Sequence, residues 1–203
     1  MSNSTENKIN LCEKYNILNE LKSKNFESIP TFEEYEWSEE FEEIGKIEYY
    51  FSNGKFHIPT LKVSYLNESL RKKTNNGCLY MMTYKNPDTN KEHILKIGQT
   101  STSLDKRIQS YNCGEIKYQN GKGTASTTNT FVKQNILNFN GEITLRAYTF
   151  DDNTISQITD INLPRFTMFS SNLISKMYKE VEGKYIEKYI SQFGEKPVLC
   201  GQK

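Results

Sequence analysis

Residues 77–107, GCLYMMTYKNPDTNKEHILKIGQTSTSLDKR, are the stretch that decides the fold. Its first eight residues alternate between two sets of side chains, the period of a half-buried β-strand. The polar segment KNPDTNKE contains a Pro-Asp step and predicts a turn. HILKIG then predicts a second strand that returns beside the first. The stretch therefore predicts two strands joined by a turn.

A helix is predicted directly after Gly98. Residues 100–103 offer four hydroxyl side chains as candidate N-caps. Leu104, Ile108 and Tyr111 follow at the spacing i, i+4 and i+7, which places them on one face of a helix. The whole stretch therefore predicts a strand–turn–strand–helix unit.

The chain before this unit predicts two helices and a hairpin. Residues 9–26 place apolar side chains on one face of an amphipathic helix. Residues 31–34, TFEE, have the capping-box pattern and predict a short acidic helix to about residue 44. Residues 47–51 and 56–65 predict two strands joined by an Asn-Gly turn.

The chain after the unit predicts a loop, a strand and a long helix. Residues 112–129 are rich in Gly, Ser, Thr and Asn, and a loop of this length is usually functional or disordered. Residues 131–139 predict a short helix, and residues 142–150 alternate as a third strand should. Residues 170–193 predict an amphipathic helix that Gly194 ends.

These elements predict an α/β (α+β) fold. We expect a small central antiparallel three-stranded sheet flanked by helices, with the N-terminal helices and β-hairpin added to it. Residues 1–75 would form an N-terminal helical and hairpin region that grips a partner or a second subunit. Residues 76–203 would form the main domain, with a polar insertion at about residues 112–141.

Charge is distributed unevenly. Residues 1–48 carry 12 Glu against 5 Lys, and residues 49–203 carry 21 Lys and Arg against 13 Asp and Glu. The resulting net charges are −7 for residues 1–48 and +8 for residues 49–203. We therefore expect the basic part of the chain to contact a polyanion.

Several classes of protein do not fit the composition. No apolar run approaches the ~18 residues that cross a bilayer, and no secretory leader opens the chain. We therefore expect a cytoplasmic protein with no membrane partner. Four cysteines lie far apart without a CxxC pair, so free thiols are expected rather than a zinc site. His93 is expected to lie at the surface of the hairpin.

Two short motifs carry a resemblance to a known family. The tripeptide CLY ends at Tyr80, the tripeptide KIG begins at Lys96, and Arg107 follows on the next helix. This order resembles the GIY-YIG nuclease superfamily over about residues 76–203. The Lys-Ile-Gly form is similar to a branch of type II restriction endonucleases.

The resemblance implies a set of site residues. In the family, a tyrosine ends the first motif and another begins the second. An arginine, a metal-binding glutamate and an amide follow. The matching positions here are Tyr80, Lys96, Arg107, Glu182 and Gln202. Three departures stand out: the second tyrosine is a lysine, a histidine one turn beyond the arginine is Tyr111, and the amide is Gln.

The chemistry that the resemblance implies is phosphodiester hydrolysis. Glu182 would hold one divalent ion per active site, Mg²⁺ or Mn²⁺, and Arg107 would bind a phosphate oxygen. Tyr80 would act as general base, with Lys96 lowering its pKa or orienting water. The reverse, a deprotonated Lys96 as base, stays open. Gln202 would bind phosphate or fix a side chain of the site.

The function that follows is metal-dependent, sequence-specific cleavage of double-stranded DNA, as in a type II restriction enzyme. We expect a homodimer that places one active site on each strand. A homing or repair-type nuclease and a catalytically silent DNA-binding protein remain alternatives. Residues 112–129 would either contact DNA or form a surface insertion.

Overall fold

The computed structural model describes six parts of the chain: residues 26–51, 59–113, 132–133, 136, 142–150 and 167–200. Its centre is one five-stranded sheet in the order β2-β1-β5-β3-β4, with every neighbouring pair antiparallel. The strands are β1 (Glu42–Phe51), β2 (Pro59–Tyr65), β3 (Cys78–Lys85), β4 (Glu92–Thr100) and β5 (Glu142–Tyr148).

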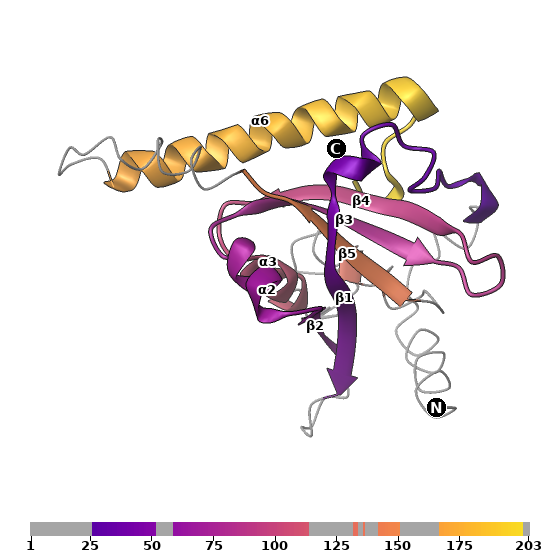
Figure 1. Ribbon diagram of the computed structural model, residues 1–203, viewed down its shortest axis with the longest axis horizontal. Coiled ribbons are helices and arrows are strands. Elements are labelled where there is room, and N and C mark those ends of the chain that lie inside the picture. The colour runs from indigo at the N-terminus through magenta and orange to yellow at the C-terminus, as the bar shows by residue number, and fades with distance from the viewer. Residues whose placement is uncertain are drawn as a thin grey trace, which may run out of the picture.

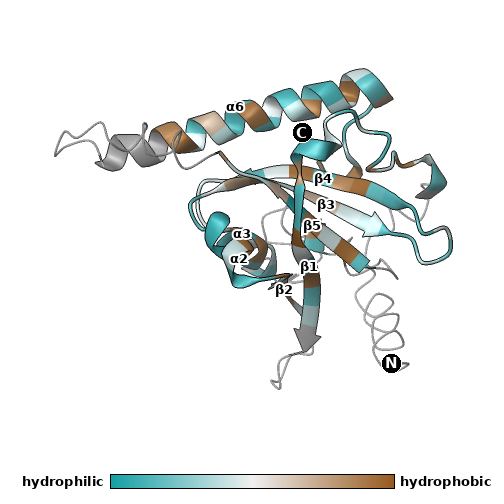
Figure 2. Ribbon diagram, viewed as in Figure 1, coloured by the Kyte–Doolittle hydropathy of each residue, from teal (hydrophilic) through white to brown (hydrophobic). Residues whose placement is uncertain are grey.

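Helices cover both faces of this sheet (Figure 1). The long helix α6 (Thr167–Phe193) lies along one face, and α2 (Glu68–Lys73) and α3 (Leu104–Ser110) lie on the other. Hydrophobic and hydrophilic residues alternate along α6, as expected for a helix with one buried side (Figure 2). The described residues also form four short 3-10 turns: η1 (Phe26–Ser28), η2 (Ser38–Glu40), η3 (Tyr111–Cys113) and η4 (Val198–Cys200).

The motif strands β3 and β4 pair as predicted, but β3 is buried on both faces. Its side chains divide between two apolar clusters. Tyr80 and Met82 belong to the cluster on the α3 side, whereas Leu79 and Met81 pack with the residues of α6. The prediction of a half-buried strand was therefore wrong, because α6 covers the face that was expected to meet solvent.

The predicted sheet of three strands was also wrong in number. The two N-terminal strands pair as expected, with Glu48 opposite Lys62, and the predicted Asn-Gly turn lies outside the described residues. However, β1 also pairs with β5, where Ile47 lies opposite Ile143, and this pairing extends the sheet to five strands. One sheet thus includes strands from both of the regions predicted as 1–75 and 76–203.

The short acidic helix expected to about residue 44 is absent. Only the single turn η2 forms, and β1 begins already at Glu42. Phe41 packs in the cluster with α6, and Ile44 packs in the cluster on the α3 side. Two apolar residues of the predicted helix thus pack on opposite faces of the sheet.

The segment before η2 closes the free edge of β4. The backbone N–H of Phe32 donates to the Glu92 carbonyl at 2.7 Å, and that of Ile94 donates to the Pro30 carbonyl at 2.9 Å. His93 is 2% exposed, with its Nδ1 atom 2.7 Å from the carbonyl oxygen of Ile29. The prediction of a surface histidine was wrong, because this segment covers the ring.

Some of the remaining predicted elements are confirmed, and others fall on residues that the structure does not describe. The helix predicted through Leu104, Ile108 and Tyr111, the helix at residues 170–193 and the strand at 142–150 are confirmed by α3, α6 and β5. Nearly all of the helix at residues 9–26 and of the loop at 112–129 lies outside the described residues, as do most of the helix at 131–139 and Gln202. None of the described helices combines the length and apolarity needed to cross a membrane.

Candidate active site

The phenol ring of Tyr80 lies against the backbone of the neighbouring strand. Tyr80 on β3 pairs with Gly98 on β4. A Cβ atom at Gly98 would lie 2.5 Å from the Tyr80 hydroxyl oxygen and 2.6 Å from Cζ, closer than such atoms can approach. Glycine is therefore required at the end of the KIG motif because the ring of the first motif occupies the space of a side chain.

The Tyr80 hydroxyl is held by two residues of the segment that begins with α3. Ser103 caps α3 by accepting a hydrogen bond from the Lys106 backbone N–H. Arg107 and Tyr111 then stand one turn apart and both reach Tyr80. The Arg107 Nε donates to the Tyr80 hydroxyl at 3.2 Å, and the two phenol oxygens lie 2.6 Å apart. The Arg107 Cζ atom lies 5.0 Å from the centre of the Tyr111 ring.

This environment keeps Tyr80 neutral at ordinary pH. Burial is the main cause that raises its pKa well above the usual value of 10.0, and Tyr111 raises it further. Arg107 acts in the opposite direction. The cation that hydrogen-bonds the Tyr80 phenol and lowers its pKa is thus Arg107. From the sequence, Lys96 was expected to lower this pKa.

Arg107 remains charged within this cluster. Burial alone would lower its pKa, but Tyr80, Tyr111 and Glu182 together outweigh burial and raise it. The guanidinium therefore offers fixed positive charge beside a pocket.

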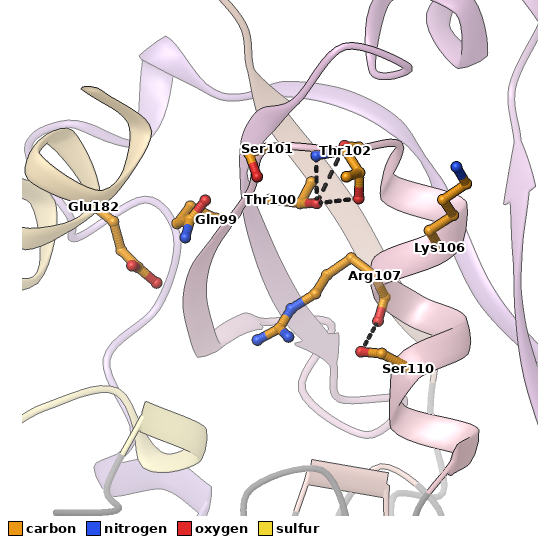
Figure 3. A pocket seen from close by; sticks show the side chains of 8 residues that line it. All are labelled: Gln99, Thr100, Ser101, Thr102, Lys106, Arg107, Ser110 and Glu182. Atoms are coloured by element: carbon orange, nitrogen blue, oxygen red, sulfur yellow. Dashed lines mark hydrogen bonds between the residues drawn. The ribbon is translucent and has the colours of Figure 1, made fainter. Parts of the chain in front are cut away.

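Arg107 and Glu182 line the same pocket of about 340 Å³. In Figure 3 the guanidinium of Arg107 and the carboxylate of Glu182 point toward a shared space from α3 and α6. The two helices lie on opposite faces of the sheet, and Gln99 and Thr100 at the end of β4 also line the pocket. The remaining lining residues are all polar: Gln99, Thr100, Ser101, Thr102, Lys106 and Ser110.

The carboxylate of Glu182 is only partly accessible. Burial is the largest influence on its pKa and raises it above the usual 4.5. The charges of Lys96 and Arg107 oppose this rise, as does a hydrogen bond from the backbone of Gln99. The neighbouring Gly183 faces open space, since a Cβ there would meet no atom within 4 Å.

Lys96 lies beside this cluster rather than on the pocket wall. Its side chain is 6% exposed, and its ammonium donates to the Leu199 carbonyl at 3.2 Å. Its Nζ atom is also 3.9 Å from the Cys200 sulfur. The charge of Lys96 therefore lowers the pKa of Glu182, and the carbonyl of Leu199 orients the Lys96 ammonium.

Four of the five predicted site residues thus meet around one pocket, although only Arg107 and Glu182 line it. Two further residues of the site were not among the predicted ones. Tyr111 was predicted on the buried helix face and at the position of the family's histidine, but its contact with Tyr80 was not predicted. Gln99 lines the pocket, and its Oε1 atom is buried without a hydrogen-bond partner in the part of the chain that the structure describes.

The donor atoms of the pocket fit one hard divalent cation. Mg²⁺ prefers oxygen ligands and keeps several waters. Glu182 supplies a carboxylate in a polar pocket, and the unpaired Oε1 atom of Gln99 lies in the same wall. Within the described residues no group of three His, Cys, Asp or Glu side chains is placed to hold a metal. A cation here would thus rely on a single carboxylate, with water and substrate completing its coordination.

Comparison with known proteins gives one informative likeness. No family model matches the chain, and no curated protein matches it. Among solved structures, the chain is similar to the restriction endonuclease HPY188I in complex with product DNA. The two share 27% sequence identity with a TM-score of 0.50, over 88% of this chain and 90% of that one.

Proposed function

We propose that the protein is a divalent-metal-dependent, sequence-specific endonuclease for double-stranded DNA, a type II restriction enzyme of the GIY-YIG kind. The observation that carries the proposal is Arg107, which hydrogen-bonds Tyr80 and shares a pocket with Glu182. The likeness to a restriction endonuclease bound to product DNA supports the same function.

Phosphodiester hydrolysis needs an activated water and relief of negative charge on the phosphate. Arg107 presents a fork of donors that stays protonated at any working pH and suits a phosphate oxygen. Glu182 would hold the Mg²⁺ or Mn²⁺ ion. When bound, this ion supplies positive charge for the transition state and for the leaving oxygen.

Tyr80 is our general base. Its hydroxyl already lies between a cation and a second phenol, so a proton lost from it leaves an anion that Arg107 stabilises. The Tyr111 hydroxyl shares a short hydrogen bond with the same oxygen and raises the pKa of Tyr80, so Arg107 is the group that favours the phenolate. Lys96 as base is the alternative assignment, and the pH dependence argued in the Discussion separates the two.

The decisive experiment is incubation with a mixed-sequence plasmid in Mg²⁺. We expect discrete fragments from the wild-type protein and none from Arg107→Ala or Glu182→Ala. Glu180→Ala is the matched control, because Glu180 is exposed on the same helix and outside the pocket. Full cutting by both pocket variants would refute the site.

The same experiment separates the rival functions. Binding in Ca²⁺ without cutting in Mg²⁺ would identify a silent DNA-binding protein. Cutting only at one long sequence would identify a homing enzyme, and cutting only damaged DNA a repair enzyme. A homodimer with two-fold symmetry, suited to a palindromic site, belongs to the restriction proposal and is tested by sedimentation on short duplex DNA.

A further inference from the structure

The ammonium of Lys96 is oriented by a turn near the C-terminus. Lys96 lies on β4, the edge strand of the sheet, and its Nζ atom donates to the Leu199 carbonyl at 3.2 Å. Leu199 belongs to η4, which follows α6 by a short connection. The acceptor is thus a neutral backbone carbonyl more than a hundred residues away in sequence.

The turn η4 is itself fixed at two points. The side chain of Leu199 is 1% exposed and packs in the apolar cluster on the α3 side of the sheet. The thiol of Cys200 donates to the Ile97 carbonyl of β4 at 3.0 Å. Within the turn, the backbone N–H of Cys200 donates to the Pro197 carbonyl at 2.7 Å. A turn anchored in the core and on the strand holds its carbonyl at a constant place.

We propose that η4 is a latch that positions the Lys96 ammonium at the active site, so that cleavage depends on Leu199 and Cys200 through Lys96. The inference rests on the proposed nuclease function and adds positioning residues to it.

The chemistry of lysine explains why a latch is useful. Its charge sits at the end of a flexible four-carbon stem, and its ammonium has three donors. One donor is satisfied by Leu199, and no ion pair within the described part of the chain uses Lys96. The positive charge therefore stays available to Glu182, whose pKa it lowers. Without the hydrogen bond to η4, the Lys96 side chain would populate several rotamers, and its ammonium would no longer stay near Glu182.

Two variants release the latch without touching Lys96. Leu199→Ala removes the anchor in the core, and Cys200→Ala removes the donor to β4, which Cys200→Ser replaces. We expect Leu199→Ala to lower kcat by about tenfold or more, since a small misplacement of a catalytic group has large effects on rate. KM for DNA should stay within about twofold, because the latch does not bind substrate. Cys200→Ser should recover most of the activity that Cys200→Ala loses.

A double-mutant cycle distinguishes positioning from a general loss of stability. In a Lys96→Met background, Leu199→Ala should cause no further fall in kcat, since two changes that act through one group are not additive. Losses that multiply in the double variant would overturn the latch, as would an unchanged kcat in both Leu199→Ala and Cys200→Ala. Thermal melting of every variant identifies any that are unfolded at the assay temperature.

A measurement without DNA completes the test. Acetylation of Lys96, followed by mass spectrometry, should be slow in the wild-type protein and at least several-fold faster in Leu199→Ala. Equal rates would overturn the latch even if DNA is cut. If Lys96 of the wild-type protein is acetylated slowly but the protein never cuts DNA in Mg²⁺, the nuclease proposal fails, and the catalytic role of the latch fails with it.

Discussion

The Nε atom of Arg107 donates a hydrogen bond to the hydroxyl of Tyr80, 3.2 Å away and 27 residues earlier in the chain. This single contact joins the first tripeptide motif to the helix after the second one. It also places a buried phenol behind a guanidinium that faces the pocket. Any proton that Tyr80 loses would leave its negative charge next to the group that we propose binds the phosphate.

Removing the Tyr80 hydroxyl should stop cleavage and leave the fold in place. We expect Tyr80→Phe to lower the rate by about 100-fold or more, the usual contribution of a general base. Its melting temperature should fall slightly, because the hydroxyls of Tyr80 and Tyr111 lose a buried hydrogen bond worth about 1 kcal/mol. Plasmid cleavage and thermal melting measure both effects. Tyr84→Phe, on the same strand face, is the control and should cut normally.

The glycine at the end of the KIG motif should tolerate no side chain. Gly98→Ala would place a Cβ 2.5 Å from the Tyr80 hydroxyl oxygen, and we expect a loss of about 1–3 kcal/mol in the free energy of unfolding. Cleavage should fall with it, because the phenol must move. Gly183→Ala is a matched control in open space within α6, where alanine should stabilise by up to about 1 kcal/mol. Equal effects of the two substitutions on denaturant unfolding would contradict this account.

The rate of cleavage should rise with pH. The base must be deprotonated, and burial raises the pKa of Tyr80, so its active fraction grows about tenfold per pH unit between roughly pH 7 and pH 9. Tyr111→Phe should move the profile to lower pH, because Tyr111 raises that pKa. Single-turnover rates over this range are the measurement.

The same profile decides between the two candidate bases. If Tyr80 is the base, the slope persists in Lys96→Met and disappears from the residual activity of Tyr80→Phe. A slope that persists in Tyr80→Phe and disappears in Lys96→Met would assign the role to Lys96 instead.

Neutralising Glu182 should stabilise the fold while abolishing cleavage. Its pKa is raised in the folded state, chiefly by burial, so its charged form opposes folding above that pKa. Glu182→Gln should therefore melt at a higher temperature than the wild-type protein at pH 7 without metal. The difference should vanish below about pH 4, where the glutamate is protonated in both states.

Metal addition gives the complementary result. Mg²⁺ should raise the melting temperature of the wild-type protein, because an ion that binds only the folded state stabilises it. Glu182→Gln should show no such rise, and EDTA should reverse the rise in the wild-type protein. An equal shift in both proteins would place the ion elsewhere.

Local sequence patterns predicted the elements that carry the site. The alternation in β3 and β5, the cap and spacing of α3, and the apolar face of α6 all act over a few residues, so the sequence shows them directly. The pairing of β1 with β5 joins strands separated by about half of the chain, and no local pattern encodes which distant edge a strand selects. For the same reason the sequence correctly placed Tyr111 on the buried side of its helix, but it could not show that Tyr111 contacts Tyr80.

The two faces of the central sheet each contribute one half of the candidate site. The carboxylate comes from α6, whose position depends on aromatic contacts such as Phe41 with Tyr185, 5.2 Å between ring centres. The guanidinium comes from α3 on the other side. A slide of α6 along the strands would therefore change the distance between Glu182 and Arg107 without disrupting either helix. Weakening these aromatic contacts should thus stop the proposed cleavage at temperatures where the sheet itself is still intact.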